Sequence, residues 1–171
     1  NLDKFEMGIA AQKIYDFIWE EFCDWYIEMV KPRLYGNDEA SKAAAIWTLR
    51  HVLTDALKLL HPYMPFVTEE IFCTLKEMEG NTADESIMIS AWPEYSDAFA
   101  FAAEEEAVEL IKEAVKGIRN LRSEMNVPPS RKAQVFVVSE QESVRAIFEN
   151  SKVFFASLGG ASEVKIQSDK T

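Results

Sequence analysis

The stretch FIWEEFCDWYIEMVKP, residues 17–32, decides the fold of the first part of the chain. Its apolar side chains recur every three to four residues, and the same spacing extends upstream. This pattern predicts one long amphipathic helix over residues 5–30. The face that such a helix would bury is made by Ile14, Ile18, Phe22, Trp25 and Met29. Pro32 has no backbone N–H to donate, so we expect it to end the helix.

Two more amphipathic helices are expected downstream of the first. One covers residues 38–60, where Asn37 or Asp38 can cap the first turn. The other covers residues 65–79, where Pro65 suits the first helical turn. Three amphipathic helices joined by short links predict an up-down bundle.

A connector over residues 82–103 follows the bundle, with a brief extended stretch expected at residues 87–89. Beyond it, a strongly periodic helix is predicted over residues 104–125, ended by the prolines of Val127-Pro128-Pro129. We therefore place a first domain, the helical bundle with its connector, at residues 1–103.

The remaining part of the chain mixes helix and strand. Runs rich in β-branched residues predict short strands at residues 134–138 and 163–167. Between them we expect one short helix opened by a capping box at residues 139–142 and another over residues 151–158. The second domain, residues 104–171, is thus a small helix–strand–helix–strand module, and the chain as a whole is mainly α.

Composition narrows the class of protein. The chain is 48% hydrophobic and 27% charged, which is typical of a soluble globular protein. No run reaches the roughly 18 apolar residues of a membrane span. The first residue is Asn1 and no apolar leader follows, so we interpret the chain as an excised piece and expect no secretion or membrane insertion.

The cysteines and histidines indicate no metal site. Cys23 and Cys73 lie far apart and are expected to be reduced core thiols of a cytoplasmic protein. His51 and His61 stand ten residues apart with no cysteine beside them, which fits no zinc-binding spacing.

The net charge of −11 argues against a generic nucleic-acid binder. The charge is uneven, however: residues 1–103 carry 8 Lys and Arg against 18 Asp and Glu, whereas residues 104–171 carry 10 against 11. Four residues of the expected fourth helix follow i, i+4, i+7, i+11 spacing and share one face, with Arg122 at its boundary. They are Lys112, Lys116, Arg119 and Ser123. Such a row could track a phosphate backbone, and a solvated helix face is the alternative.

The first helix offers two further surfaces. At about 100° per residue, Ile27 falls opposite the apolar face, beside Lys13 and Lys31, where it could contact a base or a partner. Alternatively, it is a scattered apolar residue or is covered by a helix outside this sequence. The aromatic side chains share the core-facing arc, so we expect them to pack. They are Phe17, Trp19, Phe22, Trp25 and Tyr26.

No catalytic constellation emerges from the residues. The Gly159-Gly160 pair lacks the spacing of a phosphate-binding loop, and no Ser, His and Asp set lies in a nucleophile motif. Paired carboxylates such as Glu69-Glu70 stand near helix N-termini, where they favour the helix dipole. The residues alone therefore indicate a helical bundle with a small α/β module.

A family resemblance extends this interpretation. FIWEEFCDWYIE at residues 17–28, followed by KPRL at 31–34, resembles the long helix of the anticodon-binding domain of valyl-tRNA synthetases. LLHPYMPFVTEEI at residues 59–71 resembles a segment shared by the class Ia synthetases for valine, isoleucine and leucine. The Phe-Cys-Asp-Trp-Tyr sequence of the first block points to valine.

Two later blocks follow in the order of that family. ESIM at residues 85–88 with WPE at 92–94 resembles the connector, and IRNLRSEMNVPP at residues 118–129 resembles the block after it. The match over residues 134–171 is loose. The sequence lacks the nucleotide-binding motifs of the catalytic domain, the editing domain, the C-terminal coiled-coil arm and the helix that precedes this region in the bundle, so the bundle would be incomplete at its N-terminus.

The resemblance implies a function for a larger parent enzyme. That enzyme would attach valine to its tRNA using ATP with Mg in a catalytic domain that this sequence does not contain. This region would grip the anticodon side of the tRNA, with no catalytic residue, no cofactor and no metal of its own. The expected partners are valine tRNA and the rest of the synthetase chain, in a cytoplasmic monomer without membrane contact.

The resemblance also suggests which residues bind RNA. On the anticodon side they are Ile27, Lys31 and Arg33, and along the RNA backbone they are Lys112, Lys116, Arg119 and Arg122. Two alternatives stay open. One is an acidic helical protein-interaction module that binds no RNA, which the net charge favours; the other is the equivalent region of an isoleucyl-tRNA synthetase.

Overall fold

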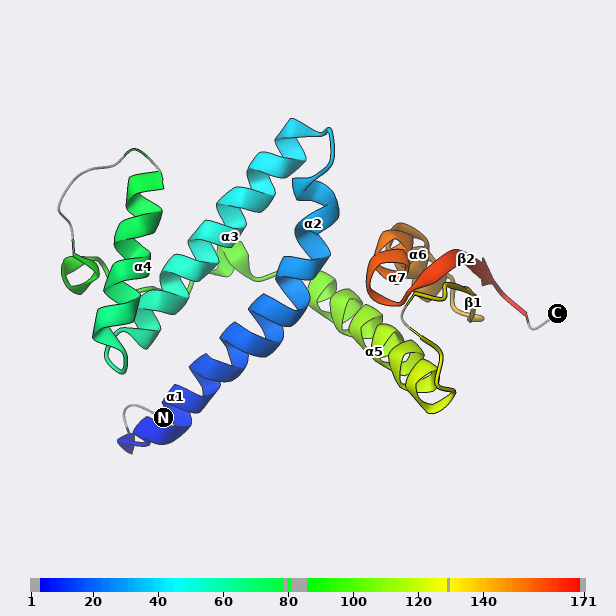
Figure 1. Ribbon diagram of the computed structural model, residues 1–171, viewed down its shortest axis with the longest axis horizontal. Helices are drawn as coiled ribbons and strands as arrows, with labels where there is room; N and C mark the ends of the chain where they lie inside the picture. The colour runs from blue at the N-terminus through cyan, green and yellow to red at the C-terminus, as the bar shows by residue number, and fades with distance from the viewer. Residues whose placement is uncertain (1–3, 79, 81–85, 129, 170–171) are drawn as a thin grey trace. The chain divides into compact units, whose positions relative to one another are not determined.

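The structure, a computed structural model, describes residues 4–78, 80, 86–128 and 130–169. It divides into two compact units, Asn1–Tyr95 and Ser96–Thr171. Helices predominate in both units, and a small parallel sheet lies in the second (Figure 1). The predicted class, mainly α with a small α/β module, is confirmed. The domain boundary expected between residues 103 and 104 stays a prediction.

One long continuous helix opens the first unit. It consists of α1 (Met7–Asp16), a π-helical stretch η2 (Phe17–Ile27) and α2 (Glu28–Leu34). The prediction that Pro32 ends it is wrong, because Pro32 lies inside α2. Proline fixes φ at a helical value and removes one hydrogen bond, and Pro32 lies only two residues before the end of α2 at Leu34.

The π-helical stretch buries only part of its aromatic side chains. Its i→i+5 hydrogen bonds make each residue advance less around the axis than in an α-helix. Phe22 and Trp25 are buried as expected, whereas Phe17 and Trp19 are 41% and 53% exposed. The expectation that all five aromatic side chains share the core-facing arc is therefore wrong for these two, which flank Ile18 and lie about 100° to either side of the centre of the apolar face.

Two antiparallel helices complete the bundle. α3 (Glu39–Leu60) begins at the N-cap Asp38, whose carboxylate accepts a hydrogen bond from the Ser41 backbone N–H at 3.0 Å. α4 (Pro65–Met78) lies beside α3 (Figure 1). Both helices confirm the sequence prediction, except that residue 79 lies outside the described residues. Leu57 of α3 and Phe72 of α4 form a core with Ile87, so burial of their apolar area holds the helix pair together.

The connector is held against α4 by one carboxylate. Glu69 Oε2 accepts hydrogen bonds from Ser86 Oγ at 3.0 Å and from the Ile87 backbone N–H at 3.1 Å. The chain then forms a 3₁₀ turn, η3 (Ile87–Ile89), so the extended stretch expected there is wrong. Ser86 caps the turn by accepting from the Met88 N–H, a local bond that competes with an extended backbone. A second 3₁₀ turn, η4 (Asp97–Phe99), follows.

The second unit begins with α5 (Ala102–Glu124), which matches the predicted fourth helix. The helix ends before Val127-Pro128. Asn126 adopts a left-handed φ of 52°, and the Val127 N–H donates to the Arg122 carbonyl at 2.8 Å. A left-handed residue with such a back-bonded N–H is a common C-terminal cap, and asparagine tolerates it. The cap, rather than the prolines alone, stops the helix.

The two strands, β1 (Ala133–Val138) and β2 (Ala161–Gln167), pair in parallel as the predicted small module. α6 (Glu142–Asn150) and α7 (Lys152–Leu158) connect them. Phe148, Phe155 and Leu158 are buried and form the core under the sheet. The capping box expected at residues 139–142 is wrong: the N-cap is Gln141, two residues after Ser139, and it makes no side-chain cap bond.

Across the described residues, none of the helices is both long enough and apolar enough to cross a membrane.

Candidate nucleic-acid interface

The residues predicted for the anticodon side lie where the long helix approaches its end. Ile27 is half-buried at the last position of η2. Lys31, half-buried on α2, donates to the Glu28 carboxylate. Arg33 ties α2 to α3, because its Nε donates to Ser41 Oγ at 2.9 Å and its Nη2 to the Ser41 carbonyl at 3.1 Å. Lys31 keeps 45% of its side chain exposed, so its ammonium can also reach a phosphate.

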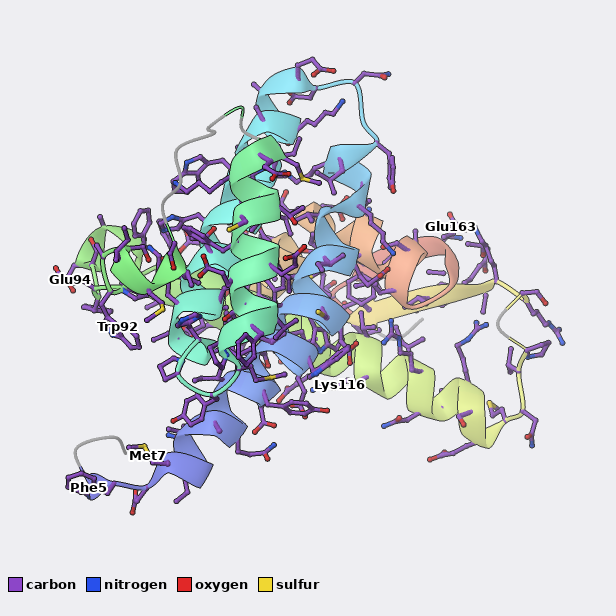
Figure 2. The ribbon with its side chains drawn as sticks, turned by 60° about the vertical axis from the view of Figure 1, so that its left-hand side comes forward. Phe5, Met7, Trp92, Glu94, Lys116 and Glu163 are labelled. Carbon is purple, nitrogen blue, oxygen red and sulfur yellow. The ribbon has the colours of Figure 1, made fainter. Side chains whose placement is uncertain are left out.

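The row of cations predicted along α5 is not one exposed face. Lys112 is only 3% exposed, and its Nζ donates to Glu109 Oε1 at 2.6 Å. Burial of a lysine is costly unless the charge is paired, and the Glu109 carboxylate supplies that pairing. Lys116, labelled in Figure 2, lies one turn further along α5 and is exposed. The expectation of a shared solvent-facing stripe is therefore wrong for Lys112.

Arg119 and Arg122 hold the second unit together. Arg119 Nε donates to the Leu158 carbonyl at 2.9 Å, which satisfies an acceptor at the end of α7. Arg122 Nη2 donates to the carbonyls of Pro128 at 3.1 Å and Arg131 at 2.6 Å. Arg122 Nη1 is buried and has no hydrogen-bond partner among the described residues. Arg119 thus bonds a carbonyl 39 residues away, whereas the carbonyls that Arg122 bonds lie six and nine residues away.

The two arginines also border a groove of about 550 Å³. Its other lining residues come from the end of α5 and from the α7–β2 turn, where Gly160 has a left-handed φ of 67°. A Cβ at residue 160 would lie 3.4 Å from the Arg122 guanidinium carbon, so glycine suits both the turn and this close approach.

A second groove, which the sequence interpretation did not single out, lies in the first unit between α3 and α4. Its volume is about 590 Å³. Aromatic and basic side chains line much of it. They are Trp47, Arg50, His51, Lys58, Phe72 and Lys76. Ser90 of the connector lines it as well.

We call this second hollow the α3–α4 groove. Aromatic rings and charged groups lie along its α3 wall. The Trp47 and His51 rings stack with centroids 4.8 Å apart and an interplanar angle of 12°. Asp55 Oδ2 lies 3.7 Å from His51 Nε2, and Asp55 Oδ1 lies 3.7 Å from Lys58 Nζ. A sequence pattern predicts this surface of α3. Residues 47, 51, 54 and 58 recur at helical spacing, opposite the leucines of α3.

α4 also carries a thiol with a perturbed pKa, that of Cys73. Partial burial, together with the carboxylates of Glu69 and then Glu70 and Glu77, holds the pKa of Cys73 above its usual 9.0. Cys73 Sγ also lies 3.6 Å from Glu69 Oε1, a contact that favours the protonated thiol. A protonated thiol is a poor nucleophile, so nothing about Cys73 points to catalysis. Among the residues described, no group of three or more His, Cys, Asp and Glu side chains could hold a metal ion.

Residues 1–137 match the model of a protein family described as the anticodon-binding domain of tRNA ligase. The chain belongs to this family. It is also similar to curated proteins named valine–tRNA ligase: 49% identical over 170 residues to that of Clostridium acetobutylicum, and 40% over 169 residues to that of Bacillus cereus. Each alignment covers 99% of this chain and 19% of the relative, so the chain spans about a fifth of the length of these proteins.

The residues that match the anticodon-binding family include all of one groove but only part of the other. The α3–α4 groove lies entirely within the matched residues. The groove beside Arg122 is completed by residues 157–160, which lie beyond the match. The resemblance inferred from the sequence blocks is confirmed by the family match and by the relatives that align with almost the whole chain.

Proposed function

We propose that this chain is the anticodon-side tRNA-binding region of a valine–tRNA ligase. The observation that carries the proposal is the combination of the family match over residues 1–137 with relatives of that one name aligned over 99% of the chain. Those relatives reach 49% identity.

The chemistry belongs to the parent enzyme, which would join valine to its tRNA through ATP with Mg in a separate catalytic domain. This region would supply binding energy at the anticodon side of the tRNA. Energy gained at such a remote site helps to place the acceptor end for reaction. We propose a cytoplasmic monomer, with residues 1–103 as the anticodon-binding domain and residues 104–171 as an appended module.

Of the residues predicted to bind RNA, we propose that Lys31 and Lys116 contact phosphates, because both expose their side chains. Ile27, half-buried beside Lys31, would pack against a loop nucleotide. Arg33, Arg119 and Arg122 would act by fixing the elements that carry the contacts, since each bonds a backbone carbonyl. Lys112 would contribute to the backbone footprint only if its pair with Glu109 opens.

Nuclease footprinting of valine tRNA tests the proposal. The 171-residue chain should protect the anticodon arm and leave the acceptor stem open to cleavage. An isoleucine tRNA of equal length serves as the competitor. Protection confined to the acceptor stem, or no protection at any protein concentration, would contradict the proposal and favour an acidic interaction module that binds no RNA.

A further inference from the structure

The α3–α4 groove is an open hollow in the first unit with two chemically different walls. α3 supplies the ring pair Trp47 and His51, and α4 supplies Lys76 and the buried ring of Phe72. Its volume of about 590 Å³ lies within the roughly 300–1,000 Å³ that small-ligand sites occupy. Neither the family description nor the names of the relatives assigns it a ligand.

We propose that this groove binds one unpaired nucleotide of an RNA loop, with the base against Trp47 and the phosphate among Arg50, Lys58 and Lys76. The inference rests on the tRNA-binding function proposed above and assigns it a site.

The ring pair is suited to a base. Trp47 is 54% exposed although indole is a large apolar group, and it already lies in a nearly parallel stack with His51. A nucleobase that adds to this stack removes indole surface from water and gains ring contact. Bases inside a duplex are stacked on each other and cannot reach such a surface, whereas a loop base can turn outward. The ring pair therefore selects for unpaired RNA.

The charges are suited to the phosphate of that nucleotide. Among the described residues, three cationic side chains line the groove against one carboxylate, Asp55, in a chain whose net charge is −11. Asp55 stands 3.7 Å from both Lys58 Nζ and His51 Nε2, too far for a short hydrogen bond to either. Lys76 Nζ lies 5.5 Å from the Phe72 ring centroid, a contact that keeps the ammonium beside the groove. The groove is thus a local cationic site on an acidic protein.

Fluorescence polarisation with labelled RNA tests the site in the 171-residue chain. The probes are a stem-loop with an unpaired loop and the same stem closed as a blunt duplex. Trp47→Ala should weaken stem-loop binding about 10-fold, and Trp47→Phe should restore most of the loss because a phenyl ring also stacks. Weak binding of the duplex should not change in either variant.

Two control variants separate the groove from general effects. Trp19→Ala removes an indole of equal exposure from η2, and stem-loop binding should not change. Lys58→Ala/Lys76→Ala should weaken stem-loop binding and flatten its salt dependence, whereas Lys152→Ala/Lys165→Ala removes the same charge from the second unit and should do neither. Circular dichroism of each variant checks that the helices are intact.

Several outcomes would overturn the inference. They are stem-loop binding that is unchanged by Trp47→Ala, an equal loss in Trp19→Ala, and no stem-loop binding by the unmodified chain. Displacement of the RNA by a poly-glutamate peptide at equal concentration would show instead that the groove takes acidic peptides. Footprinting on valine tRNA distinguishes the two proposals: protection of the anticodon arm that survives Trp47→Ala retains the proposed function and rejects this site.

Discussion

At the scale of single residues, spacing along the sequence predicts which side chains share a helix face but not which groups they bond. Spacing placed Lys112, Lys116 and Arg119 on one face of a helix, and the helix exists. It could not show that the Leu158 carbonyl, 39 residues away, takes the Arg119 guanidinium, or that Glu109 pairs with a buried Lys112. The hydrogen-bond partner of a long cationic side chain depends on tertiary contacts. The sequence alone therefore cannot predict whether such a side chain binds RNA or holds two elements of the protein together.

Arg122 should matter for stability more than for RNA binding. Arg122→Met keeps the alkyl stem but removes the donors to the Pro128 and Arg131 carbonyls. Because Arg122 is partly exposed, we expect a loss of about 1–3 kcal/mol in the free energy of unfolding of the second unit. Urea denaturation followed by circular dichroism measures it, with exposed Lys132→Met as the matched control. Equal stability of the two variants would mean that these bonds contribute nothing.

The thiol of Cys73 should report its surroundings through alkylation. Its raised pKa follows from partial burial first and then from Glu69. At pH 8.5, in a Cys23→Ser background, iodoacetamide should react more slowly than with a free thiol, because less thiolate is present. Glu69→Gln lowers the pKa and should speed the reaction, and Glu70→Gln should do so less. A reversed order of these two variants would contradict the assignment of causes.

At the scale of elements, periodicity located the four long helices and both strands to within a few residues. It failed where the backbone leaves standard geometry. Residues 87–89 form a 3₁₀ turn where the sequence predicts an extended stretch, and two aromatic side chains of η2 are exposed where the sequence predicts packing. The α3–α4 groove was also missed, since it depends on how two helices and Ser90 come together. Local propensity cannot indicate that assembly.

The cap of α3 gives a test at this scale. Asp38→Ala removes the carboxylate that accepts a hydrogen bond from the Ser41 N–H. Ser41 also accepts the hydrogen bond from Arg33 that joins α2 to α3. We expect a loss of about 1 kcal/mol in the free energy of unfolding of the first unit. Asp38→Asn retains an acceptor and should lose only a fraction of this amount. Differential scanning calorimetry measures both; an equal loss in the two variants would show that charge, rather than capping, stabilises the helix.

At the scale of the whole chain, the charge of −11 makes any RNA contact local and sensitive to salt. Each phosphate contact with single-stranded RNA contributes about 0.7 to the slope of log K against log salt concentration. If Lys116 contacts a phosphate, Lys116→Ala should flatten the slope by about that amount for every tRNA, because backbone contacts carry no sequence information. Exposed Lys165→Ala is the control. Equal slopes for both variants and the unmodified chain would remove Lys116 from the interface.

The most direct measurement of the central claim is aminoacylation by a chimera. The corresponding segment of the Clostridium acetobutylicum valine–tRNA ligase, 49% identical over 170 residues, is replaced by this chain. The chimera should charge valine tRNA with valine, and changing the anticodon of that tRNA should lower kcat/KM at least about 10-fold, the loss expected from one or two lost base contacts. A chimera that folds and activates valine with ATP, yet charges the tRNA equally well whatever its anticodon, would contradict the assignment of this chain to anticodon recognition.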